Sequence, residues 1–381
     1  MCAKDVQSEE ASEEPADEPT EMDVELQSIV EENDAAQESS SLNLQMLQAK
    51  IEELEAKNEM LSRKVELSRF CFSRFSHDNE MINFYTGFTK FAIFEAFFNY
   101  IQPTADKMTR LYYIPVEGAT PRASSQRSLP LIDEFFLFCC RIRLGLLEDD
   151  LSVRFGISTA TVSRLIISWA NFLYFVLGAI PIWPTREMVN LHMPPAFKAL
   201  YPKTRCILDC TEVFTERPSS LVLNSQMYSN YKSHCTLKGL IGIAPNGAIT
   251  FVSKLYTGSI SDVAIVKDSG FLNLVQAQDS IMADKGFTIR KMLEEVGATL
   301  NIPSFLTGKV QFSPEEITMN QQIATVRVHV ERAIRRIKVY RIFSSPLPLS
   351  LMGSCNQLWT VVCLLTNFRG ALIKDKVPET S

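Results

Sequence analysis

An apolar run at residues 206–214 places the strongest constraint on the fold, because it contains two acidic residues. The run reads CILDCTEVF, with Asp209 and Glu212 set among Ile, Leu, Val and Phe. This composition is typical of a buried strand, in which an unpaired carboxylate is costly. We therefore expect a positive charge beside Asp209.

The chain after residue 200 has the pattern of a mixed α/β domain. The strand at 206–214 is followed by two apolar runs within 236–256, which are joined by Pro245-Asn246-Gly247. Asn-Gly is a strong hairpin signal. The rest of the pattern predicts a helix, a strand, a further strand and a long helix, at 261–275, 280–287, 297–305 and 320–343. This order is that of a ribonuclease-H-like fold, which we predict for residues 200–370.

Three acidic residues fall where this fold would bring them together. Asp209 ends or interrupts the first strand, Asp284 ends the fourth, and Glu331 lies on the late helix. Clustered carboxylates repel one another unless a cation joins them. Hard oxygen ligands favour Mg²⁺ or Mn²⁺ over zinc. We predict two ions ~3.5–4 Å apart, bridged by Asp209, which would activate water and stabilise a leaving oxygen at phosphorus.

The late helix also carries basic residues on the same face as Glu331. Arg327, Glu331, Arg335 and Lys338 are spaced to share one face, with an apolar stripe of Val326, Val330, Ala333 and Ile337 behind them. The three cations suit a phosphate backbone, so we predict that they bind DNA. The alternative is a solvated face with ion pairs between successive turns.

A helix-turn-helix pattern occupies part of a predicted helical domain at residues 121–180. Gly156 breaks the helical pattern at 149–169, and Ser158 or Thr159 is suited to cap the second helix. This helix would enter the major groove with Thr159, Thr161 and Arg164 near its start. The alternative is a plain helical bundle, because two arginines in this stretch are few for phosphate contacts.

The first 69 residues combine an acidic tail with a heptad pattern. Residues 1–40 hold 14 Asp or Glu and one Lys, which leaves 37 Lys and Arg against 30 Asp and Glu in the remainder. We expect a solvated, disordered tail, or one that binds a partner or shields a basic surface. Residues 41–69 predict a parallel coiled-coil homodimer, with Leu44, Leu47, Ile51, Leu54, Asn58, Leu61 and Val65 at its a and d positions. The alternative is one amphipathic helix packed on its own chain.

Other features favour a soluble intracellular protein. The nine cysteines form no CxxC pair, which argues against a zinc finger or a disulfide scaffold. The longest apolar run, at 172–183, is too short to span a bilayer, and the acidic N-terminus is unlike a signal peptide. We predict an aromatic-rich core helical segment at 70–120 and a linker at 120–128. We expect no membrane association, and nuclear localisation.

The sequence resembles the DDE superfamily endonucleases of PIF/Harbinger-type transposons, whose animal branch is often fused to a THAP zinc finger. The resemblance covers about residues 80 to 370. It rests on an ordered series of motifs: YTGF, FCCRIRLGLLEDDLSVRFGISTATVSRLI, DCTEVFTERP, YSNYKSHCTLKGLIGIAPNGAITFVSKLYTGSISD, MADKGF, NIPSF and RVHVERAIRRIK.

The resemblance implies that Asp209, Asp284 and Glu331 form a catalytic triad and that Asp262 is a further metal-binding acid. Asp262 could instead cap the helix that follows it. No zinc-finger ligands precede the heptads, so DNA specificity would come from the helix-turn-helix or from a protein partner. We predict a metal-dependent DNA endonuclease. The alternative is a non-catalytic nuclear DNA-binding or adaptor protein that acts through its coiled coil and acidic tail.

Overall fold

A computed structural model describes residues 43–65, 69–108, 127–304, 311 and 313–373. The predicted acidic tail and most of the predicted linker at 120–128 lie outside the described residues. The chain divides into two compact units, residues 1–68 and residues 69–381, which we describe separately.

In the first unit, residues 43–65 form one continuous helix, as the heptad pattern predicts. Lys50 pairs with Glu53 and Arg63 with Glu59, each at 2.7 Å. The six apolar heptad residues, Leu44, Leu47, Ile51, Leu54, Leu61 and Val65, are between 47% and 66% exposed. The helix is therefore confirmed, while its pairing with a second copy stays a prediction.

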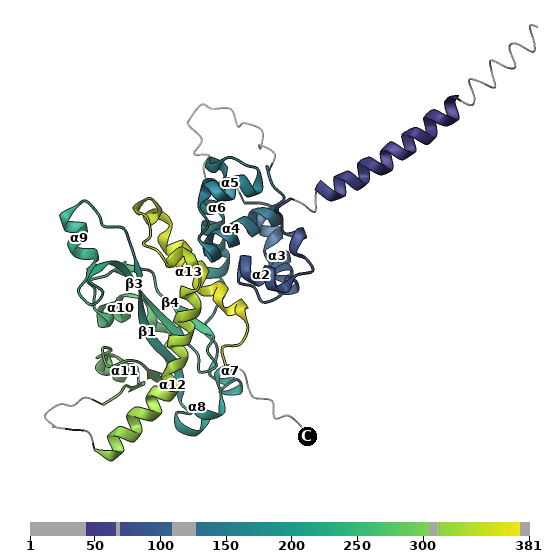
Figure 1. Ribbon diagram of the computed structural model, residues 1–381. Coiled ribbons are helices and arrows are strands. Elements are labelled where there is room, and N and C mark those ends of the chain that lie inside the picture. The colour runs from purple at the N-terminus through teal and green to yellow at the C-terminus, as the bar shows by residue number, and fades with distance from the viewer. Residues whose placement is uncertain (1–42, 66–68, 109–126, 305–310, 312, 374–381) are drawn as a thin grey trace, which may run out of the picture. The chain divides into compact units, whose positions relative to one another are not determined.

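The second unit begins with a helical region (Figure 1). The core of this region is rich in aromatic residues. A short 3-10 helix, Ser73–Phe75, precedes α2 (Asn79–Thr86), α3 (Phe91–Ala105) and α4 (Leu131–Leu144). Phe135 and Phe136 on α4 are fully buried and pack on aromatic rings from the preceding segments. The predicted core segment is divided at Gly87, whose φ of 85° ends α2. A Cβ at Gly87 would lie 2.8 Å from the Tyr340 hydroxyl.

The helix-turn-helix elements are α5 (Glu148–Phe155) and α6 (Thr159–Gly178). Gly156 adopts a φ of 64° at the break, a conformation that costs glycine little. Ser158 is the N-cap of α6, because its side chain accepts a hydrogen bond from the backbone N–H of Thr161. The predicted break and cap are both present.

A mixed sheet in the order β2-β3-β1-β6-β7 forms the centre of the second unit. The long strands β1 and β3 are antiparallel, and β3 also pairs with β4 and β5. On its other edge, β1 is parallel to β6, which is parallel to β7. The first and fourth predicted strands, β1 and β6, are therefore neighbours. The strand bounds are β1 Thr204–Phe214, β2 Tyr228–Ser229, β3 His234–Ile243, β4 Ile249–Val252, β5 Tyr256–Thr257, β6 Ser280–Met282 and β7 Thr299–Asn301.

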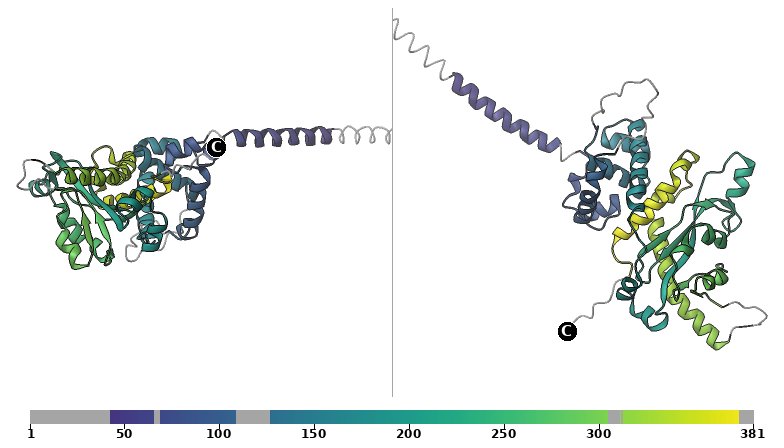
Figure 2. Two further views of the ribbon diagram at one scale, coloured as in Figure 1. Left: turned by 90° about the horizontal axis from the view of Figure 1, so that it is seen from below. Right: turned by 180° about the vertical axis from the view of Figure 1, so that it is seen from behind.

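Helices cover both faces of this sheet (Figures 1 and 2). Alternate β1 residues separate the two cores: Ile207 and Val213 pack with residues of α12 and α13, whereas Leu208 packs with residues of α10 and α11. This arrangement is consistent with the predicted ribonuclease-H-like α/β fold. The helices are α7 Arg186–Leu191, α8 Pro195–Leu200, α9 Leu221–Met227, α10 Asp262–Asp268, α11 Arg290–Glu295, α12 Pro314–Lys338 and α13 Cys355–Thr366; 3-10 turns lie at Phe271–Leu274, Arg341–Phe343, Leu349–Ser354 and Asn367–Arg369.

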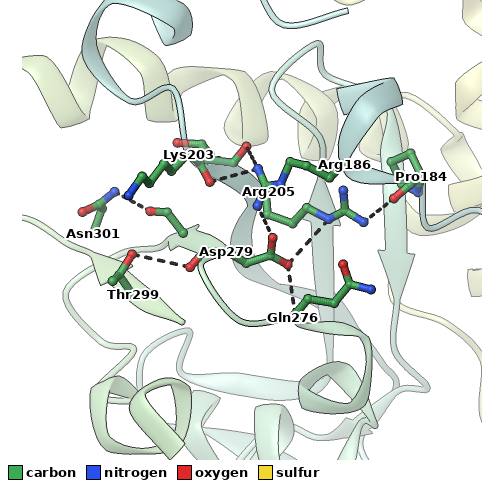
Figure 3. A network of polar contacts seen from close by, with 10 residues as sticks. Pro184, Arg186, Lys203, Arg205, Gln276, Asp279, Thr299 and Asn301 are labelled. Carbon is green, nitrogen blue, oxygen red and sulfur yellow. Dashed lines mark hydrogen bonds and ion pairs between the residues drawn. The ribbon is translucent and has the colours of Figure 1, made fainter. Parts of the chain in front are cut away.

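A buried polar network fixes the start of β1 against the start of β6 (Figure 3). The Asp279 carboxylate pairs with Arg186 and lies 3.7 Å from Nε of the buried Arg205. Arg186 also donates to the Lys203 carbonyl at 3.1 Å. These contacts join the segment that enters β1 to the loop that enters β6, so they set the alignment of the two strands.

Within the described part of the chain, two helical stretches are long and apolar enough to cross a membrane by length and composition, Thr159–Gly178 and Leu349–Arg369. About half of each is buried within the protein. Trp169 of α6 and Trp359 of α13 are fully buried members of the same hydrophobic core. Both stretches therefore have the character of core helices.

Candidate active site

The three predicted catalytic acids reach one point from three different elements. Asp209 lies in the middle of β1 rather than at its end, and Asp284 follows the last residue of β6 by two positions. Glu331 lies on α12, whose apolar stripe is buried as predicted. Because β1 and β6 are adjacent and α12 packs on β1, the three side chains converge.

Their meeting point is the guanidinium of Arg327. Its Nη2 atom lies 4.0 Å from Asp209 Oδ2 and 3.5 Å from Glu331 Oε1, and its Nη1 atom lies 3.5 Å from Asp284 Oδ1. The side chain of Arg327 is only 15% exposed. Arg327 therefore supplies the positive charge that the sequence requires beside Asp209. The prediction assigned that charge to a metal ion and Arg327 to DNA binding.

Burial sets the protonation of Asp209. Desolvation raises the pKa of its carboxyl from 3.8 to about 6, against the lowering effect of Arg327 and of a hydrogen bond from the Cys210 N–H. The neighbouring charges of Asp284 and Glu331 raise this pKa further. The site thus places a carboxylate where water alone stabilises its charge poorly, which favours a cation as its partner.

The donor set fits a hard divalent cation. Three carboxylates from separate elements face one positive group, and carboxylate oxygens are the ligands that Mg²⁺ and Mn²⁺ prefer. No three His, Cys, Asp or Glu side chains among the described residues lie close enough in this arrangement to hold an ion. Asp209, Asp284 and Glu331 are the residues that would hold a metal, and the Arg327 guanidinium lies among them.

Asp262 belongs to a neighbouring polar cluster. Ser261 is the N-cap of α10, so Asp262 is its first helical residue and not its cap. Lys238 on β3 lies 3.3 Å from Asp262 and 4.0 Å from the buried Glu212, and it donates to the Ile260 carbonyl at 3.0 Å. Asp262 therefore contacts Lys238 here, where we expected it to join the pocket of Asp209.

The Asp262 cluster still adjoins the loop that carries Asp284. A Cβ added at Gly286 would lie 3.3 Å from Asp262 Oδ2, so this loop packs closely on Asp262. Asp262 also interacts with the Cys210 thiol, whose pKa is raised by burial and by this carboxylate. The metal-binding role of Asp262 stays a prediction, and its observed contacts position the loop.

The other two predicted DNA-binding residues of α12, Arg335 and Lys338, differ in environment from Arg327. Arg335 and Lys338 are exposed. Partial desolvation lowers the pKa of Lys338, and the charge of Lys232 on the β2–β3 turn lowers it further. The C-terminal half of α12 therefore presents cations to solvent beside the acids, as the DNA-binding prediction requires.

The predicted base-reading residues of the helix-turn-helix are not equally available. The Thr159 hydroxyl donates to Asp149 at 3.1 Å, and the Thr161 hydroxyl lies 2.9 Å from that of Ser158. Both threonines are half-buried, whereas Arg164 is exposed. Of the three, Arg164 is the residue best placed to reach DNA.

Sequence reasoning named Arg327 but assigned it to DNA binding, with ion pairing along the helix as the alternative, and it missed Lys238. Arg327 and Glu331 are four residues apart, a spacing typical of helical ion pairs, which was the available signal. Lys238 interrupts the apolar strand TLKGLIGI as Asp209 interrupts its own strand, so a buried partner for Lys238 could have been expected. The partner's identity depends on register, because Lys238 lies opposite Glu212.

Comparison with known families gives two matches along the chain. Residues 208–367 match the model described as a DDE superfamily endonuclease. Residues 127–179 match the helix-turn-helix of the same superfamily. No curated protein and no solved structure matches the chain.

Both matches agree with the architecture. The endonuclease match includes Asp209, Asp284 and Glu331, and endonuclease domains of the DDE type generally use divalent metals. The helix-turn-helix match spans α5 and α6 and supports DNA binding. The chain therefore belongs to the DDE superfamily of transposase-derived endonucleases.

Proposed function

We propose that the protein cuts DNA phosphodiester bonds with Mg²⁺ or Mn²⁺, as an endonuclease of the PIF/Harbinger type. The observation that carries this proposal is the convergence of three carboxylates on one poorly exposed cation. Asp209 lies on β1, Asp284 lies on the loop directly after the parallel neighbour β6, and Glu331 lies on a helix that packs against β1.

In the proposed mechanism, Asp209, Asp284 and Glu331 are the residues that would hold the divalent metal. Metal bound there would supply the positive charge that activates an attacking water and stabilises the leaving oxygen. Asp284 and Glu331 are 51% and 57% exposed, so they lie on the side from which DNA would approach. Arg335 and Lys338 bind the phosphate backbone and hold the strand against the acids.

We also propose how the other segments serve this activity. Arg164 on α6 contacts DNA, with Thr159 and Thr161 supporting the start of the helix, and residues 43–65 pair two copies of the chain. A protein partner supplies sequence specificity beyond that of Arg164. The protein acts in the nucleus, where its DNA substrate lies.

The test compares wild type with Asp209→Asn in paired nicking and binding assays on duplex DNA with Mg²⁺ or Mn²⁺. We expect cleavage to fall by several orders of magnitude, because charge stabilisation by bound metal supplies much of the rate. DNA binding should persist and weaken steeply with salt. The matched control is Asp268→Asn, which removes an exposed carboxylate of α10 that pairs with Lys254. Equal nicking by wild type and Asp209→Asn would show that the site is wrong.

A second candidate function is a non-catalytic nuclear adaptor, which acts through the helix at 43–65 and the acidic tail. The exposed apolar stripe of this helix favours it, because such a stripe is suited to binding another helix. Wild-type protein that binds metal and DNA but never cuts would favour this function over the endonuclease.

A further inference from the structure

We propose that the Arg327 side chain competes with the metal for the three carboxylates of the site. Its guanidinium neutralises the three carboxylates in the metal-free protein, and the divalent cation displaces it toward the DNA-facing side of α12. This inference rests on the proposed function and adds a regulatory step to it, because metal loading would then promote DNA binding.

The contacts of Arg327 differ from those of a structural ion pair. Its three N–O separations, 3.5, 3.5 and 4.0 Å, exceed the ~2.7–2.9 Å of a strong charge-assisted hydrogen bond. By contrast, Arg127 donates to the buried Glu134 at 2.8 Å. The Nε atom of Arg327 is buried and has no hydrogen-bond partner. The guanidinium therefore balances charge without being locked by directional hydrogen bonds, and it is suited to release.

The metal and the guanidinium would occupy the same region. A cation bound to these three carboxylates would lie within a few ångströms of the Arg327 nitrogens, which already approach each acid to 4.0 Å or less. Two positive groups at that separation repel strongly in a poorly exposed site. Binding of one therefore disfavours the other.

The displaced Arg327 guanidinium can join other basic side chains on the same helix. Arg327, Arg335 and Lys338 share one face of α12, and the latter two are exposed beside the acids. A released guanidinium joins these cations and adds a phosphate contact. Because linkage between two binding events is reciprocal, metal should strengthen DNA binding and DNA should strengthen metal binding by the same factor.

The experiment measures Mn²⁺ binding to the full-length protein by calorimetry without DNA. We compare wild type, Arg327→Gln, Arg327→Lys and the matched control Arg332→Gln, which removes one exposed charge from another face of the same helix. Arg327→Gln should bind Mn²⁺ at least about fivefold more tightly than wild type, the lower end of typical site–site coupling. Arg327→Lys and Arg332→Gln should stay close to wild type.

A second readout tests the link to DNA. Fluorescence anisotropy measures the affinity for duplex DNA in EDTA and in Ca²⁺, which is another hard cation. The gain in DNA affinity from EDTA to Ca²⁺ should be larger for wild type than for Arg327→Gln. The inference is overturned if Arg327→Gln binds Mn²⁺ equally or more weakly than wild type, if Arg327→Lys binds as tightly as Arg327→Gln, or if the DNA gains are equal. Absence of Mn²⁺ binding in wild type and every variant would instead overturn the proposed function, and this inference with it.

Discussion

Replacement of Asp209 by Asn should stabilise the protein in the absence of metal, and the gain should depend on pH. Burial raises the pKa of the Asp209 carboxyl in the folded protein from 3.8 to about 6. The folded state therefore binds this proton more tightly than the unfolded state does. As the pH rises from about 4 through 6, the carboxyl ionises in a site that disfavours its charge, and the folded state loses stability.

The pKa shift of Asp209 sets the size of the stabilisation that we expect for Asp209→Asn. A difference of about two pKa units corresponds to roughly 3 kcal/mol, at 1.36 kcal/mol per unit. The side chain is 19% exposed, so solvent screens the charge only partly. Asn keeps the shape of the side chain and cannot ionise. Asp209→Asn should thus be more stable than wild type by up to ~3 kcal/mol at pH 8, and the two should be similar at pH 4.

The assay is chemical denaturation in EDTA at several pH values between 4 and 8. Glu331→Gln serves as a control, because its carboxylate is 57% exposed and better stabilised by water, and it should show a much smaller gain. Mn²⁺ at about a thousand times its Kd should reverse the order, since it then stabilises the form that binds it by about 4.1 kcal/mol, which exceeds the gain of ~3 kcal/mol. A wild-type-like pH profile for Asp209→Asn, or its destabilisation at pH 8 in EDTA, would refute the reasoning.

Three further predictions concern other parts of the chain. Asp279→Ala should lower the free energy of unfolding by about 3–5 kcal/mol in denaturation experiments, because it leaves the buried Arg205 without its carboxylate partner. Leu54→Asp should convert a dimer to a monomer in analytical ultracentrifugation of the full-length protein, whereas Asn58→Ile should raise the stability of the helix pair and loosen its oligomeric state. Arg164→Ala should weaken DNA binding and reduce the slope of affinity against salt concentration by about one phosphate contact.

The architecture was accessible from the sequence where local patterns are strong. The two strands around Pro245-Asn246-Gly247 form as expected, and the apolar stripe of α12 is buried as its spacing indicates. The predicted fold correctly placed β1 beside β6. Their pairing could be predicted because it depends on the order of the strands and helices along the chain, and not on particular side chains. The convergence of three acids at this edge followed from that adjacency.

The charges within the site were harder to predict, because they depend on tertiary contacts. Spacing placed Arg327 on the same face as Glu331, but only the packing of α12 on β1 brings it to Asp209 and Asp284. The contact between Asp262 and Lys238 was also hard to predict, because it depends on the position of Asp262 on α10 and on the register of Lys238 on β3. The division of the aromatic segment at Gly87 reflects the close approach of Tyr340, which lies far away in sequence.

Crystals of the full-length protein soaked in Mn²⁺, with data collected at the manganese absorption edge, would test the central claim most directly. The account predicts anomalous density bound by Asp209, Asp284 and Glu331, with metal–oxygen distances near ~2.0–2.6 Å, as for hard cations on carboxylates. It also predicts that the Arg327 guanidinium has moved away from the three carboxylates. Anomalous density elsewhere with none at these acids, or a guanidinium that remains between them at saturating Mn²⁺, would contradict it.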